Sequence, residues 1–169
     1  MLYEPSDDSF LLQEQVRKYA KGKVLDIGTG TGILAKTALE KTKDVLAVDI
    51  NEEAVKHCKK LNINCIKSDL FEKVKGKFDL IIFNPPYLPE DNINLEDNLN
   101  HIGGKKGNEI LERFFSQAKE HLKKDGKILV LFSSLTPNIN NIIKKYNFKF
   151  KKLSEKSFFF EKLYVYLVY

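Results

Sequence analysis

The sequence predicts an α/β fold with a mostly parallel, doubly wound sheet of seven strands. The first observation is that short aliphatic or β-branched segments alternate with helical segments over about 130 residues, as in successive strand–helix–strand units. The second is that the last two strand-like segments, about 148–153 and 159–168, have no helix between them. This arrangement predicts a closing antiparallel hairpin.

The length and composition fit one globular domain over residues 1–169. With 43% hydrophobic and 30% charged residues the chain can bury a sizeable core, which excludes disordered, collagen-like and disulfide-stabilised classes. The two cysteines, Cys58 and Cys65, form no metal-ligand pattern, so we predict no metal site and a reduced, cytoplasmic protein. No apolar run is long enough to span a membrane, and no signal peptide is visible. The net charge of +5 permits an anionic partner without requiring one, because the lysines are spread along the chain.

The first half of the chain supplies three strands and three helices. Ser6 is a suitable N-cap, and Asp7 and Asp8 suit the first turn of a helix, so residues 1–22 are expected to form a lid and the N-terminal helix. Asn51 is expected to cap a later helix. The expected elements are helices over 6–21, 34–41 and 52–61, and strands over 23–27, 45–50 and 62–67.

The second half begins with a fully apolar strand and a long polar loop. The loop, residues 88–107, is long for a compact domain, and we expect it to lie on the substrate side of a functional site. The pair Asp125-Gly126 is expected to end a helix, and Phe158–Phe160 to pack in the core or within the hairpin. The expected elements are strands over 79–83 and 127–133, and helices over 108–124 and 137–146.

A glycine-rich turn follows the first strand. Gly28, Gly30 and Gly32 allow the backbone to approach a ligand closely. The dinucleotide-binding fingerprint G-x-G-x-x-G would require glycine at position 33, which is Ile33, and it would place a pyrophosphate near the carboxylate of Asp26. That carboxylate instead favours a ligand with an ammonium or sulfonium group, and S-adenosylmethionine carries both.

Acidic residues also end the next two strands. Asp49 follows Gly28 by about 20 residues, the position from which a carboxylate accepts hydrogen bonds from both ribose hydroxyls. Asp69 follows the third strand and is placed to meet the adenine edge. One such acid alone is often a solvated loop residue. Acids at the carboxyl ends of three successive strands, together with the glycine turn, predict a site for S-adenosylmethionine.

The fourth strand is followed by Asn84-Pro85-Pro86-Tyr87, for which we predict a catalytic role. The prolines stiffen the backbone and remove two hydrogen-bond donors, leaving the side-chain oxygen of Asn84 and the carbonyl of Pro85 as fixed acceptors. Two acceptors suit a planar NH2 group, whose lone pair is drawn out of conjugation and can attack a sulfonium methyl group. Tyr87 is expected to pack against the target plane, so Asn84, Pro85 and Tyr87 are the predicted substrate-binding residues. A merely stiff loop is the alternative, which the glycine turn and the acids disfavour.

These motifs resemble those of the HemK-like group of class I methyltransferases, which have a Rossmann-like fold. Members methylate the side-chain amide of the glutamine in the Gly-Gly-Gln motif of translation release factors. The resemblance spans nearly the whole chain and includes residues 3–9 and the glycine-bearing stretch 103–107. Few residues precede Val24, whereas bacterial members carry an additional helical domain there, so the pattern is that of the compact archaeal and eukaryotic branch.

The resemblance implies S-adenosylmethionine as cofactor and a class I release factor as substrate. In the compact branch it also implies a small zinc-binding activator subunit that adds a strand beside residues 62–67. Ile63, Cys65 and Ile66 would give that strand an apolar edge that needs cover, although a short edge strand hidden by a helix is the alternative. The predicted cofactor site combines the glycines with the positions carried over from the family: Ser9, Asp26, Gly28, Gly30, Gly32, Asp49, Asp69, Leu70 and Asn84.

Other functions remain open from the sequence. The same motif serves the exocyclic amines of adenine N6 and guanine N2, but the chain has no added recognition domain and no cluster of basic and aromatic residues for a flipped base. We therefore expect nucleic acid to be at most an indirect partner. Methylation of a protein lysine would need a base to deprotonate the ammonium, and none is evident. A non-catalytic scaffold subunit is disfavoured because both motifs are intact.

Overall fold

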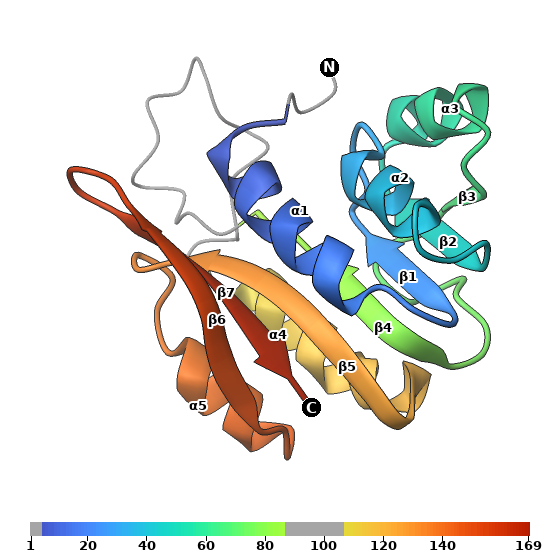
Figure 1. Ribbon diagram of the computed structural model, residues 1–169. Helices are drawn as coiled ribbons and strands as arrows, with labels where there is room; N and C mark the ends of the chain where they lie inside the picture. Colours follow the sequence, from blue (N-terminus) through green and yellow to red (C-terminus); the bar gives the residue numbers. More distant parts are fainter. Residues whose placement is uncertain (1–4, 87–106) are drawn as a thin grey trace.

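A computed structural model describes residues 5–86 and 107–169 and contains a seven-stranded sheet in the order β3-β2-β1-β4-β5-β7-β6 (Figure 1). Strands β1 to β5 run parallel, and β7 runs antiparallel to both β5 and β6. The predicted mostly parallel, doubly wound sheet with its closing hairpin is therefore confirmed. The strands are β1 (Val24–Ile27), β2 (Val45–Asp49), β3 (Cys65–Lys67), β4 (Phe78–Phe83), β5 (Leu122–Ser133), β6 (Phe150–Ser157) and β7 (Lys162–Val168).

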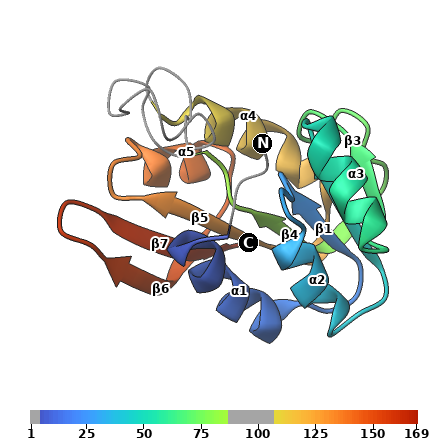
Figure 2. The same ribbon diagram turned by 90° about the horizontal axis from the view of Figure 1, so that it is seen from above.

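Helices cover both faces of the sheet, as Figure 2 shows most clearly for α4 and α5 on one side and α1 and α2 on the other. Successive side chains of β4 point to opposite faces: Leu80 and Ile82 pack in the core with α1, α2 and α3, whereas Ile81 and Phe83 pack in the core with α4 and α5. The helices are α1 (Asp7–Tyr19), α2 (Ile33–Leu39), α3 (Glu52–Lys60), α4 (Glu109–Ala118) and α5 (Ile139–Lys145). In the described ranges, no helix combines the length and the apolar character needed to cross a membrane.

The strand order reverses at β1, which pairs with β2 on one side and with β4 on the other. The register aligns Ile27 with Val48 and with Phe83, so the carboxyl ends of the three strands lie side by side. Ligands of open α/β sheets bind in the crevice outside such a switch point. The glycine turn, Asp49 and Asn84 therefore meet at one edge of the sheet.

The helix predicted over 108–124 is wrong at its carboxyl end. Helix α4 stops at Ala118, a short 3-10 turn covers Lys119–His121, and β5 begins at Leu122. Gly126 lies at a β-bulge in β5, where an added Cβ would come within 2.8 Å of the Phe78 carbonyl oxygen. A glycine that ends a helix and a glycine at a bulge look alike in a sequence. Here the glycine is needed because the backbone of β4 comes close to it.

The closing hairpin projects beyond the carboxyl end of β5, because Ser133 at that end pairs with Leu163 near the start of β7. Phe158, Phe159 and Phe160 lie at its turn with exposed fractions of 41%, 90% and 85%. The expectation that they pack in the core is therefore wrong, whereas packing within the hairpin is found: the rings of Phe159 and Phe160 meet edge to face at a centroid distance of 4.5 Å. Figure 1 shows the hairpin extending past the rest of the sheet, so its tip lies away from the described core.

The edge strand β3 covers only three residues, fewer than the predicted 62–67. The expectation that apolar side chains are exposed along this edge is also wrong for Ile63 and Cys65. These side chains are 3% and 2% exposed and lie in the core beneath α2 and α3. In the part of the chain that the structure describes, β3 pairs with β2 alone. Its outer backbone edge, rather than its side chains, is the feature left for a partner.

Candidate active site

The glycine turn between β1 and α2 presents bare backbone. Gly28 and Gly30 have φ values of 68° and 55°, and a Cβ at either position would meet no atom of residues 5–86 or 107–169 within 4 Å. Both positions therefore leave room for a ligand against the main chain. Gly32 differs, because a Cβ there would approach Ile63 Cδ1 at 2.7 Å. Gly32 allows the turn to pack against the segment that leads into β3.

Asp26 lies fully buried beneath this turn. Its Oδ2 accepts hydrogen bonds from the Thr29 hydroxyl at 2.7 Å and from the Ala35 amide at 3.1 Å. Its Oδ1 is buried without a hydrogen-bond partner among the described residues. Burial raises the pKa of Asp26 to about 7, although the two hydrogen bonds oppose this rise. An unsatisfied carboxylate of this kind fits a cofactor that brings a cationic group.

Asp49 shapes the other side of the turn. Its Oδ2 accepts the Gly30 amide at 2.9 Å, and its Oδ1 accepts the Asn51 amide at 2.8 Å. Asn51 in turn caps α3 by accepting the Glu53 amide, as predicted. Each carboxylate oxygen can accept more than one hydrogen bond. The carboxylate of Asp49 can therefore hold the turn and still receive two ribose hydroxyls.

The segment after β3 holds Asp69 in a surface ion pair. The Asp69 Oδ2 accepts a hydrogen bond from the guanidinium of Arg113 on α4 at 2.8 Å. Arg113 had no predicted role, because nothing in the sequence relates it to a residue far along the chain. Leu70 is buried with a φ of 47°, and the Ser68 hydroxyl donates to its carbonyl at 3.0 Å. Adenine binding by Asp69 and Leu70 stays a prediction.

Asn84 directly follows β4, and the nitrogen and oxygen of its side-chain amide have different surroundings. Its Nδ2 donates to Asp8 Oδ2 at 3.1 Å, whereas its Oδ1 is buried without a partner among the described residues. Asp8 belongs to the first turn of α1, beside the predicted cofactor residue Ser9. Sequence reasoning placed Asp8 at a helix start and missed this contact. The only signal was its position within the motif at 3–9, because Asn84 lies far away in the sequence.

The remaining predicted residues divide into two groups. Pro85 is buried and Pro86 is half-buried, directly after Asn84. Tyr87, residues 88–106 of the predicted substrate-side loop and residues 1–4 of the predicted lid lie outside the described residues. The described part of the site thus joins the glycine turn, two carboxylates and one free amide oxygen along the carboxyl edge of β1, β2 and β4.

The strand order, the antiparallel β7 and the acids around a glycine turn define a class I S-adenosylmethionine-dependent methyltransferase fold. Residues 6–159 match the family model of the methyltransferase small domain, and the chain belongs to this family. A Methanocaldococcus jannaschii protein that carries the provisional name protein N5-glutamine methyltransferase is 41% identical over 97% of this chain and 89% of its own length. Mouse methyltransferase HEMK2 is 30% identical over 83% of this chain and 73% of its own.

The fold also matches solved structures. The E. cuniculi Mtq2–Trm112 complex, described as responsible for methylation of the termination factor eRF1, matches with a TM-score of 0.81. The match covers 99% of this chain and 97% of the other at 22% identity. The two chains therefore share the fold along their whole lengths.

Replacing Asp49 with alanine should weaken S-adenosylmethionine binding by about 1–3 kcal/mol, the range for hydrogen bonds to charged groups. The ribose hydroxyls lose their acceptor and the Gly30 amide loses its own. Isothermal titration calorimetry measures the change. Asp44→Ala is the matched control, because Asp44 is exposed just before the opposite end of β2. An unchanged affinity in Asp49→Ala would remove Asp49 from the site.

The affinity for S-adenosylmethionine should fall as the pH is lowered below about 7, where a proton on Asp26 competes with the cation of the cofactor. The limiting slope is about tenfold per pH unit, since one proton must leave before the cation binds. Titrations between about pH 5.5 and 7.0 stay below the pKa of the cofactor's own amino group. The Asp26→Asn variant should bind S-adenosylmethionine more weakly at the upper end of this pH range, and its affinity should change less with pH. Equal slopes in the two proteins would contradict the pairing of Asp26 with a cation.

Proposed function

We propose that this protein transfers a methyl group from S-adenosylmethionine to the side-chain amide of a glutamine, in the Gly-Gly-Gln motif of a class I translation release factor. The observation that carries the proposal is Asn84 Oδ1, a buried acceptor that has no partner among the described residues. It lies at the carboxyl end of β4, directly before two prolines. The protein related at 41% identity, whose provisional name gives glutamine methylation, supports the same reaction.

The reaction follows from holding an amide by its two hydrogens. S-adenosylmethionine, when bound, supplies an electrophilic methyl group. One N–H of the substrate amide donates to Asn84 Oδ1 and the other to the carbonyl of Pro85, which reduces the conjugation of the nitrogen lone pair. The lone pair forms the new N–C bond as the methyl group leaves the cofactor sulfur. The methylated nitrogen then releases a proton to water, a step that needs no strong base because an N-protonated amide is very acidic.

The cofactor is expected to lie across the carboxyl edge of β1 and β2. The cofactor packs against the protein main chain in the space in front of Gly28 and Gly30, and Asp49 binds its ribose. The Asp26 oxygen that lacks a partner in the described part of the chain suits the cationic end. These three features come from adjacent strands, so they can bind different parts of one extended ligand. We propose Ser9, Asp69 and Leu70 as further contacts.

We also propose that a small zinc-binding activator subunit adds a strand beside β3, near residues 62–67, in a cytoplasmic heterodimer. Two observations support this part of the proposal. In the described part of the chain, β3 is an edge strand, so its outer backbone groups are available for pairing. The similar E. cuniculi protein is itself in complex with a second chain, Trm112.

The assay that tests the function uses labelled S-adenosylmethionine and the class I release factor of the same organism, with and without the activator subunit. Label should enter the release factor and disappear when the glutamine of its Gly-Gly-Gln motif is replaced by asparagine. Transfer that survives this replacement would overturn the glutamine assignment. Transfer to RNA or to another protein, from enzyme shown to bind the cofactor, would indicate a different planar amine.

Asn84→Ala should lower the rate of methyl transfer by about 100-fold or more, the effect of removing one oriented polar group from an active site. The affinity for S-adenosylmethionine should stay within about threefold, because Asp49 and the glycine turn remain. Single-turnover rates and calorimetry separate the two quantities. Asn141→Ala, an exposed site on α5, is the control for a general effect of the substitution. Normal turnover in Asn84→Ala would contradict the proposed mechanism.

A further inference from the structure

The first turn of α1 contacts Asn84, at the end of β4, through the buried side chain of Asp8. Asp8 is 2% exposed, and its Oδ2 accepts the Nδ2 hydrogen of Asn84 at 3.1 Å. The other carboxylate oxygen, Oδ1, accepts hydrogen bonds from the Ser6 hydroxyl at 2.7 Å and from the Ser9 amide at 2.6 Å. The Ser9 hydroxyl adds a longer contact at 3.3 Å. These contacts fix the carboxylate, and its second oxygen faces Asn84.

An asparagine side chain has two nearly isosteric orientations. Rotation by half a turn exchanges the amide oxygen with the NH2 group, and sterics alone hardly distinguish the two. The two orientations offer opposite hydrogen-bonding groups to a substrate amide. With the oxygen outward, Asn84 accepts the substrate N–H. With the NH2 outward, two donors oppose each other and the substrate cannot bind productively.

We propose that Asp8 is a positioning residue that selects the reactive orientation of Asn84. Both oxygens of Asp8 accept hydrogen bonds in the structure, as those of an ionised carboxylate do, so Asp8 faces the NH2 group of Asn84. The amide oxygen is then turned away from Asp8, and it is the atom that lacks a partner among the described residues. This role rests on the proposed methylation of a planar amide.

The charge on Asp8 also strengthens Asn84 as an acceptor. A hydrogen bond from the amide NH2 to an anion is stronger than one to a neutral acceptor. It draws electron density toward the amide oxygen, and hydrogen bonds in such chains reinforce one another. The substrate N–H therefore meets an oxygen that is both correctly placed and more basic than that of an isolated amide.

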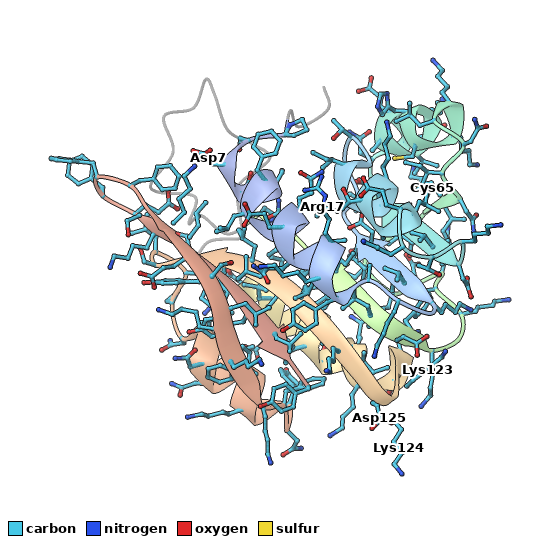
Figure 3. The ribbon with its side chains drawn as sticks, in the orientation of Figure 1. Asp7, Arg17, Cys65, Lys123, Lys124 and Asp125 are labelled. Atoms are coloured by element: carbon cyan, nitrogen blue, oxygen red, sulfur yellow. The ribbon has the colours of Figure 1, made fainter. Side chains whose placement is uncertain are left out.

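The neighbouring Asp7 provides a matched control. Asp7 lies one position away on the same helical turn, but its side chain is 49% exposed and pairs with Lys156 of β6 at 2.7 Å. Figure 3 shows Asp7 at the start of α1 on the side of the hairpin. The two acids share a helix end and a residue type, and only Asp8 reaches Asn84.

The first experiment compares Asp8→Asn with Asp7→Asn. Asparagine at position 8 keeps the size of the side chain but accepts from or donates to Asn84 equally, so the orientation is no longer selected. The kcat of methyl transfer should fall about tenfold or more in Asp8→Asn, the scale of one hydrogen bond to a charged group. Cofactor affinity and the thermal unfolding midpoint should stay near those of the wild type. Asp7→Asn should keep its kcat within about twofold, as expected for an exposed ion pair.

The second experiment reverses the pair. Asn84→Asp alone places two carboxylates together and should be nearly inactive. In the double variant Asp8→Asn/Asn84→Asp, the amide at position 8 donates to the carboxylate at position 84, whose other oxygen again faces the substrate. The double variant should be about tenfold or more faster than Asn84→Asp. Because Asp8→Asn alone slows the wild type about tenfold, the coupling between the two positions is about 100-fold. A role of Asp8 in helix stability alone would give no such rescue.

The outcomes separate this proposal from the proposed function. If the wild type binds the cofactor but does not methylate a planar amide, both proposals fail together. If the wild type is active and Asp8→Asn retains its kcat, the positioning role alone is overturned. Multiplicative effects of the two single substitutions, without rescue in the double variant, would overturn it as well.

Discussion

The parallel pairing of β1 with both β2 and β4 is the constraint on which the site depends. The register places Ile27 beside Val48 and Phe83, so the residues that follow these strands leave the sheet at one edge. The glycine turn, Asp49 and Asn84 are brought together by this pairing alone, although they are spread over more than fifty residues of sequence. A shift of one residue in the β1–β4 register would turn the side chains of β4 to the wrong cores and move Asn84 away from the turn.

Two oxygen atoms at this edge are buried without a hydrogen-bond partner in the described part of the chain, Asp26 Oδ1 and Asn84 Oδ1. Leaving a buried acceptor unsatisfied costs about 1–3 kcal/mol, so two of them on neighbouring strands call for an explanation. They belong to β1 and to the segment after β4, which are adjacent in the sheet. Ligand binding can satisfy both, and their chemistry differs: the carboxylate suits a cation and the amide oxygen suits an N–H donor. Under the proposed function, the carboxylate belongs to the cofactor side and the amide oxygen to the substrate side.

The sequence predicts those parts of the molecule that depend on local patterns. Alternating strand and helix segments, the Asn51 cap and the glycine turn are set by neighbours in the chain, and the structure confirms them. Features that depend on distant contacts are missed. Gly126 marks a bulge because the Phe78 carbonyl comes close to it, and Gly32 is needed because Ile63 lies against it. The exposure of Phe159 follows from how far the hairpin extends beyond the sheet, which no local pattern encodes.

The first turn of α1 shows how one short segment can connect two parts of a molecule. Successive residues of an α-helix point about 100° apart, so Asp7 and Asp8 face different surroundings although they are neighbours. Asp7 is directed to Lys156 of the hairpin and Asp8 to Asn84 at the end of β4. The exposed pair is screened by water and contributes little to stability, whereas the buried contact involves an ion away from solvent. A buried carboxylate is costly to keep, and here Ser6, Ser9 and Asn84 all donate to it. The bonds from Ser6 and Ser9 hold the carboxylate, and the bond from Asn84 both helps to stabilise it and ties the orientation of the amide to α1.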